Sequence, residues 1–135
     1  MLRLIVFLRP FARYLLIFWL LTIIIVSSIP SIPTLKIHTS KSEIRLDYLI
    51  HFCEYGILAG MAVLTFVSSE FKITGKRFLL ISAGLILFAI LDEYHQKLIP
   101  GRAFNLKDIY SNIAGILGAA VFCVVVFKII SRNKS

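Results

Sequence analysis

The sequence predicts an all-α fold: an integral membrane bundle of four transmembrane helices, with both termini in the cytoplasm. Hydrophobic residues make up 59% of the 135 residues, more than an ordinary soluble domain contains, and the mean hydropathy is +0.89. Four apolar segments each approach the ~20 residues that cross a ~30 Å hydrocarbon core as a helix. A single domain of this length cannot cover four such segments with a polar surface, which disfavours a soluble fold. The segments are Tyr14–Ile29, Tyr48–Val67, Phe78–Gln96 and Ile109–Ile130.

The first apolar segment has two interpretations. Three arginines precede it, at positions 3, 9 and 13, and the stretch PSIP follows it at 30–33. The long arginine-containing stretch before the segment, and the lack of an Ala-x-Ala signal-peptidase site after it, favour a retained membrane anchor. The alternative is a signal peptide cleaved near Ser27 and Ser28, which would leave the later helices in place.

The connections between the segments differ in length. Ser27–Arg45 contains Pro30 and Pro33 and is expected to be extended, because proline fixes φ and removes a hydrogen-bond donor. Ser68–Arg77 is a short connection, and Pro100–Gly101 marks a tight turn. Short connections make consecutive helices antiparallel neighbours, so we expect a compact bundle.

The distribution of charge sets the orientation. With four spans, the termini and the second connection share one side of the membrane, which receives nine of the 15 basic residues. This bias places the termini in the cytoplasm. Every acidic residue except Glu70 falls on the outer side, so the net charge of +8 belongs to the cytoplasmic side. Such a pattern indicates contact with anionic lipid headgroups and gives no indication of nucleic acid binding.

Small residues indicate where helices approach each other closely. Gly56 and Gly60 form a G-x-x-x-G pattern, and Ser111, Gly115 and Ala119 recur at every fourth position. We expect these faces to pack against each other within one chain. The alternative is that Gly56, Gly60 and Gly115 form a face for a partner helix or a homo-oligomer.

Polar residues follow one face of each of the last three predicted helices, all near the outer membrane interface. Carboxylates are costly in hydrocarbon, so these faces must converge on one another. Spacings of three, four and seven or eight residues define the faces. Their members are Asp47, His51, Glu54 and Tyr55 in the second helix, Asp92, Glu93, His95 and Gln96 in the third, and Asp108 and Asn112 in the fourth.

The residue types in this cluster suggest roles. Histidine is a residue type that accepts and donates protons, so His51, beside Asp92 or Glu93, can position or transfer a proton. Arg102 presents a forked cation that suits a phosphate or a carboxylate, although an ion pair with an aspartate would explain it equally well. The remaining members are expected to bind the ligand: Asp47, Glu54, Tyr55, Gln96, Asp108 and Asn112.

Motifs for other chemistry are weak or missing from the sequence. His51, Glu54, Asp92 and His95 are metal-ligating residue types, but their spacing is not diagnostic of zinc and leaves metal binding open. The sequence contains no nucleophile elbow, Walker loop or dinucleotide fingerprint, so we expect no cofactor.

The polar residues form four blocks with fixed internal spacing. They are Asp47-x-x-x-His51-Phe52-x-x-Tyr55, Asp92-Glu93-x-x-Gln96, Pro100-Gly101-Arg102 and Asp108-x-x-x-Asn112-x-x-Gly115-x-x-Gly118. In this order, over about residues 45–120, they resemble the VanZ-like family of small polytopic membrane proteins. One departure is Tyr48, where such proteins often have a lysine, so any charge from that lysine must come from elsewhere.

The resemblance implies a multi-pass protein of the bacterial cell membrane. The family is named for an association with low-level resistance to the glycopeptide teicoplanin, and its biochemical activity is not established. We therefore expect a single VanZ-like domain, residues 1–135, whose outward-facing polar pocket binds an anionic lipid-linked envelope precursor.

Two other functions fit the same residues. In the first, the protein is a non-catalytic interaction protein, and the charge network only joins the helix ends. In the second, it is a proton-coupled carrier. The carrier is less well supported, because carriers usually place acidic groups near the membrane midplane and these lie near one interface.

Overall fold

Most of the residues that the computed structural model describes are helical, and the described ranges are 2–30, 36–39, 42–68 and 70–132. The elements in chain order are α1 (Leu2–Leu8), the 3-10 turn η1 (Arg9–Phe11), α2 (Ala12–Ser27), β1 (Lys36–Thr39), β2 (Ser42–Arg45), α3 (Leu46–Phe66), α4 (Gly75–Gln96) and α5 (Leu106–Arg132). Within the described ranges, the only strands are the two of this short hairpin.

Four helical stretches are long and apolar enough to cross a membrane, which confirms the predicted membrane bundle. They are Ile5–Ser27, Leu46–Phe66, Gly75–Gln96 and Leu106–Arg132. Many large apolar side chains on them face outward, among them Ile25 and Leu79, and a bilayer would cover these.

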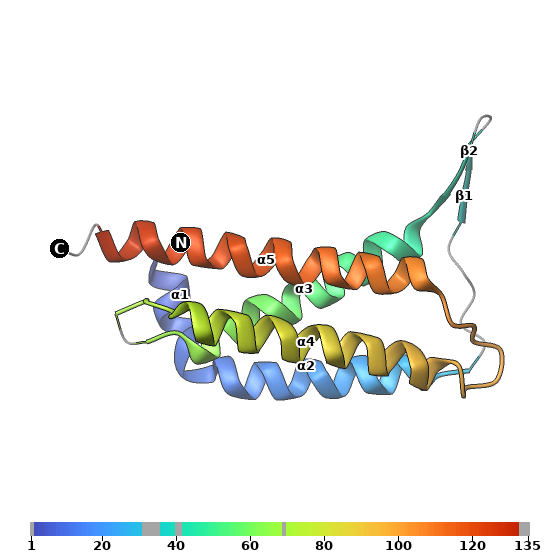
Figure 1. Cartoon of the computed structure of the whole chain (residues 1–135), viewed down its shortest axis with the longest axis horizontal. Coiled ribbons are helices and arrows are strands. Elements are labelled where there is room, and N and C mark those ends of the chain that lie inside the picture. The colour runs from blue at the N-terminus through green and yellow to red at the C-terminus, as the bar shows by residue number, and fades with distance from the viewer. Residues whose placement is uncertain (1, 31–35, 40–41, 69, 133–135) are drawn as a thin grey trace.

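The first span begins before the predicted segment. The arginine-rich lead forms α1, which turns away from the axis of α2 at η1 (Figure 1). Pro10 lies in the first positions of η1, where its missing N–H breaks the regular pattern of helical hydrogen bonds. The change of direction at residues 9–11 therefore has a local cause in the sequence.

The hairpin lies within the connection that was predicted to be extended. β1 and β2 pair antiparallel, with Lys36 opposite Arg45, and they project beyond the end of the helices (Figure 1). α1 and the C-terminal end of α5 lie together at the other end (Figure 1). The termini thus share one end of the bundle, and their location in the cytoplasm stays a prediction.

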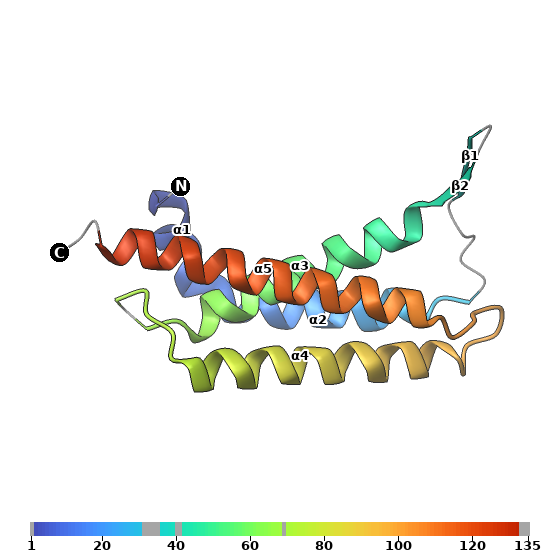
Figure 2. The same cartoon turned by 45° about the horizontal axis from the view of Figure 1, so that its top comes forward.

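The contact between α3 and α5 is the most extensive in the bundle. Toward the hairpin, α3 diverges from α4 and also moves away from α5 (Figure 2). Glycines make the α3–α5 contact close: a Cβ on Gly56 would lie 3.5 Å from the carbonyl oxygen of Gly115. The small-residue faces therefore meet within one chain, and a homo-oligomer through Gly56, Gly60 and Gly115 stays a prediction.

Two groups of buried apolar residues lie along this contact. The group nearer the hairpin joins Ile23 of α2, Tyr55 and Leu58 of α3, Ala89 of α4 and Ile116 of α5. The group at the other end joins residues of α3 and α5 with Phe71 from the connection between α3 and α4. The group nearer the hairpin packs next to the polar residues at that end of the bundle.

Replacing Gly115 with alanine should destabilise the bundle. The new Cβ would lie 2.2 Å from the carbonyl oxygen of Phe52, so two helix backbones must separate. We expect Gly115→Ala to lower the free energy of unfolding by about 3 kcal/mol, the upper part of the range for overpacked cores. Thermal unfolding in detergent micelles, followed by circular dichroism, measures this change.

Gly118→Ala is the matched control. Gly118 lies one turn further along α5, is exposed, and has no atom within 4 Å of an added Cβ. Alanine there should leave stability unchanged or raise it by up to about 1 kcal/mol through helix propensity. Equal stability of the two variants would contradict the close α3–α5 contact.

Candidate functional site

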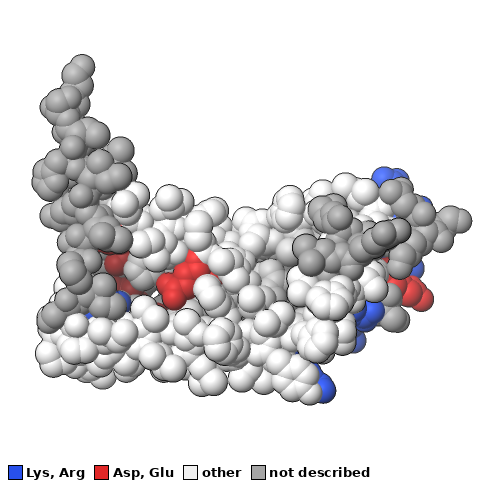
Figure 3. Space-filling view, turned by 180° about the vertical axis from the view of Figure 1, so that it is seen from behind, with Lys and Arg blue, Asp and Glu red and all other residues white. Residues whose placement is uncertain are grey.

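The polar residues of the spans gather at the hairpin end of the bundle. Figure 3 shows acidic atoms at this end, surrounded by uncharged side chains, while most basic atoms lie at the opposite end. The acidic residues here are Asp47 and Glu54 of α3, Asp92 and Glu93 of α4, and Asp108 of α5. We call these five residues, together with Ser27, His51, Tyr55, Gln96, Arg102 and Asn112, the hairpin-end cluster.

Asp92 is the centre of a hydrogen-bond network that joins three helices. Its side chain is buried, and Ser27 Oγ of α2 donates to its Oδ1 at 2.6 Å. Tyr55 Oη of α3 donates to its Oδ2 at 2.9 Å, and Gln96 Nε2, one turn further along α4, donates to the same oxygen at 3.1 Å. Three donors satisfy a carboxylate that would otherwise be very costly at this depth.

Arg102 extends this network outward. Gly101 has a φ of 77°, a conformation that favours glycine, and the backbone N–H of Arg102 donates to the carbonyl of Ile99 at 3.1 Å. This turn brings the half-buried guanidinium back toward α4, where it donates to Gln96 Oε1. The amide of Gln96 thus connects Arg102 to Asp92.

Glu93 connects α4 to the start of α5. Its side chain is fully buried, and its Oε1 accepts a hydrogen bond from the backbone N–H of Asn105 at 2.7 Å. Its Oε2 has no hydrogen-bond partner among the described residues. One oxygen of this carboxylate therefore has a structural partner, and the other is buried without one among the described residues.

His51 and Asn112 add further unsatisfied polar atoms. His51 Nε2 of α3 lies 3.8 Å from Asp108 Oδ2, in the first turn of α5. Within the described part of the chain, His51 Nδ1 has no partner, and neither does either amide atom of the fully buried Asn112. Unpaired buried polar atoms are rare in folded proteins, so these atoms distinguish this part of the cluster from the fully hydrogen-bonded carboxylate of Asp92.

The structure brings most of the predicted site residues together. Tyr55, Asp92, Gln96 and Arg102 form one connected network. Glu93, His51 with Asp108, and Asn112 add the unsatisfied atoms. Asp47 and Glu54 are half-buried on α3, and His95 is half-buried on α4, outside the hydrogen-bond network described above.

Sequence reasoning missed three participants. Ser27 was assigned to a loop, yet it is the buried last residue of α2 and bonds to Asp92. Trp19 Nε1 donates to the carbonyl of Glu54 at 3.0 Å and joins α2 to α3. Asn105 contributes only a backbone N–H, which no residue pattern reveals. The position of Ser27 could have indicated this contact, because its hydroxyl lies at the end of the first span, at the same depth as Asp92.

The charge of the cluster is mostly negative. Against its five carboxylates, Arg102 is the half-buried cation, while Lys97 and Lys107 are exposed. Among the described residues, no group of three or more His, Cys, Asp or Glu side chains is placed to hold a metal ion. The arrangement can accept hydrogen bonds from a ligand at Glu93, and it can offer donors at Arg102 and Asn112.

Four membrane-spanning helices with a polar cluster at one end define a small polytopic membrane protein. The family described as VanZ/LLP1 matches residues 4–128, nearly the whole chain, and the chain belongs to this family. The predicted resemblance is thereby confirmed. No curated protein matches the chain, and no solved structure does either.

Removing the hydroxyl of Tyr55 should destabilise the bundle. Tyr55→Phe leaves the ring in place but takes one donor from the buried carboxylate of Asp92. We expect a loss of about 1.5–3 kcal/mol, the range for a hydrogen bond to a charged group. Tyr110→Phe is the control: Tyr110 is 67% exposed, so its change should stay within about 0.5 kcal/mol. Unfolding of both variants in micelles compares them, and equal effects would contradict the network.

Proposed function

We propose that this protein acts in the bacterial cell envelope by binding an anionic, lipid-linked envelope ligand at the hairpin-end cluster. The cluster would face outward, in agreement with the positive-inside prediction. Through this binding the protein would contribute to low-level resistance to teicoplanin, the property for which the VanZ family is named. Membership of that family makes the envelope the place to look for the ligand.

The observation that carries the proposal is the set of buried polar atoms that have no hydrogen-bond partner in the described part of the chain. They are Glu93 Oε2, His51 Nδ1, and Nδ2 and Oδ1 of Asn112, from α3, α4 and α5. A cluster that served only to join helix ends would gain stability by pairing or removing these atoms. A bound ligand with donors and acceptors would satisfy them.

Arg102 supports an anionic group on that ligand. One of its N–H groups donates to Gln96, which leaves further donors of the guanidinium fork for a phosphate or carboxylate. The remaining acidic groups favour hydroxyl, amide or ammonium donors beside that anion. Lipid-linked envelope precursors combine these features, because a phosphate at headgroup height adjoins a sugar or a peptide.

His51 and Glu93 would then position a proton of the ligand. Asp92 is less suited to this role than the sequence suggested, since three donors already occupy it. Glu93 retains an unpaired oxygen, and His51 retains an unpaired Nδ1. These two groups are therefore the proposed contacts for the ligand's donors.

A second candidate function follows from the satisfied state of Asp92. If the network only fixes the bundle, the protein is a non-catalytic interaction protein that docks a membrane partner. The three hydrogen bonds within the chain favour this candidate for Asp92 itself. They do not explain the unpaired atoms of Asn112, which separate the two candidates.

Asn112→Leu distinguishes them. Leucine has a similar volume and removes a buried, unpaired amide, so the protein should fold at least as stably as wild type. The ligand proposal predicts that cells carrying Asn112→Leu or Arg102→Ala become as susceptible to teicoplanin as cells without the protein. Susceptibility is measured in a bacterial host after immunoblots establish equal membrane levels.

Lys107→Ala is the control for Arg102→Ala. Lys107 is an exposed cation near the start of α5, and its removal should leave susceptibility unchanged. If Asn112→Leu and Arg102→Ala both keep wild-type resistance at normal abundance, the ligand proposal is wrong and the interaction protein remains.

A further inference from the structure

A second candidate site lies in the other half of the bundle. A groove of about 700 Å³ runs between α2, α3 and α4, away from the hairpin-end cluster. Leu16 and Leu20 of α2 form one wall, and Gly84 and Leu85 of α4 form another. The volume lies within the range of about 300–1,000 Å³ that is typical of small-molecule sites.

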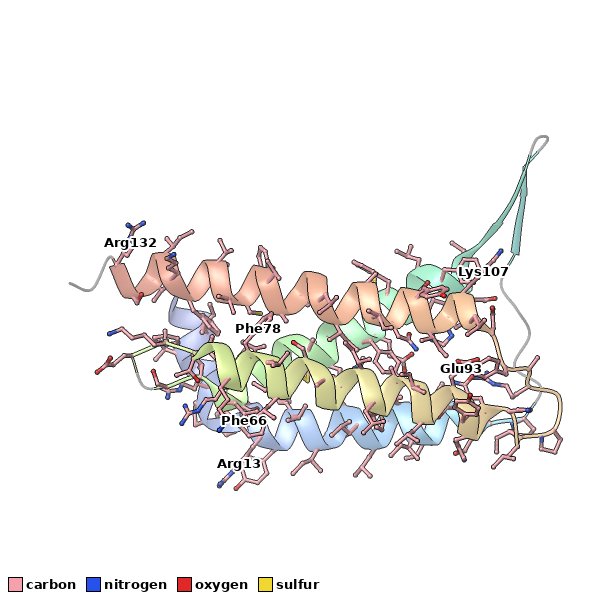
Figure 4. All side chains as sticks on the ribbon, viewed as in Figure 1. Arg13, Phe66, Phe78, Glu93, Lys107 and Arg132 are labelled. Atoms are coloured by element: carbon pink, nitrogen blue, oxygen red, sulfur yellow. The ribbon has the colours of Figure 1, made fainter. Side chains whose placement is uncertain are left out.

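The groove opens toward the lipid-facing surface. Two of its lining residues, Phe66 and Leu80, are 52% and 62% exposed, so the groove is not sealed by the protein. Phe66 lies at the end of the bundle opposite Glu93 and Lys107, as the labelled side chains in Figure 4 show. In a bilayer, water would not fill an apolar recess at this depth, and hydrocarbon chains would.

One end of the groove carries a positive charge. Arg77 lines it from the first turn of α4, where the backbone N–H of Arg77 donates to the N-capping hydroxyl of Thr74 at 3.3 Å. Within the described residues, the Arg77 guanidinium makes no hydrogen bond or ion pair. Nearby on the same end, Arg13 is engaged with the hydroxyl of Tyr14 at 2.7 Å.

We propose that the groove is a binding site for one anionic glycerophospholipid, with an acyl chain along Leu16, Leu20 and Leu85 and the phosphate at Arg77. The groove complements such a lipid, because its apolar walls suit an acyl chain and the cation at its end suits a phosphate. Basic pockets between transmembrane helices are known to hold anionic headgroups. A second transmembrane helix fits less well, because it would need its own acidic group at the height of Arg77.

Native mass spectrometry of the full chain tests this proposal. The protein is reconstituted with equal amounts of phosphatidylglycerol and phosphatidylcholine, and the lipids that stay bound after detergent exchange are counted. We expect wild type to retain phosphatidylglycerol preferentially. Arg77→Gln should reduce this preference about fivefold, the effect of one basic residue near a membrane surface, and Arg77→Lys should keep most of it.

Gly84 allows the groove to be filled without strain. No atom lies within 4 Å of an added Cβ on Gly84, so Gly84→Leu can fold and occupy the space of the acyl chain. This variant should retain neither phosphatidylglycerol nor phosphatidylcholine. Gly118→Leu and Arg132→Gln are the controls, since Gly118 is equally open, Arg132 is exposed, and both lie on α5 outside the groove.

Several outcomes would overturn the proposal. It is wrong if Arg77→Gln and Arg132→Gln retain the same lipids, or if Gly84→Leu keeps its lipid as Gly118→Leu does. It is also wrong if wild type is a dimer that Gly84→Leu converts to monomer, because a second copy of the chain would then occupy the groove. Circular dichroism of each variant establishes that the helices are intact.

Discussion

The buried carboxylate of Asp92 is the constraint on which the arrangement of the helices depends. A charge at this depth is tolerated only when donors surround it, and the three donors come from α2, α3 and α4. Each helix must therefore present one particular residue at one height: Ser27, Tyr55 and Gln96. The fourth helix needs a different attachment, which Glu93 and the close glycine contact with α3 provide.

These attachments divide the bundle into parts with different roles. At Gly56 and Gly115, α3 and α5 pack closely, whereas α3 and α4 diverge toward the hairpin (Figure 2). Among the described residues, His51, Glu93 and Asn112 of the hairpin-end cluster keep unpaired polar atoms. At the other end, α2, α3 and α4 leave an apolar groove beside Arg77. The polar cluster and the apolar groove thus lie toward opposite ends of the bundle.

Hydropathy and helical spacing predicted the four spans and the faces that converge on Asp92, because both depend on residue type at regular intervals. Pairing depends on side-chain direction and depth, which these patterns do not contain. Arg102 was expected at an anion or an aspartate, yet its hydrogen bond is to Gln96. Ser27 was assigned to the proline-containing connection that follows the first span, yet it is the last residue of α2 and bonds to Asp92. The hairpin was not predicted, because it lies in a connection whose prolines indicated only extended backbone.

The most direct test of the role of Asp92 is a double-mutant cycle between Ser27 and Asp92. The free energy of unfolding in micelles is measured for wild type, Ser27→Ala, Asp92→Ala and the double variant. If the Oγ–Oδ1 hydrogen bond of 2.6 Å joins α2 to α4, the two single changes are coupled by about 1–3 kcal/mol. Additivity within about 0.5 kcal/mol would contradict the account, because Ser27 would then be stabilised independently of Asp92.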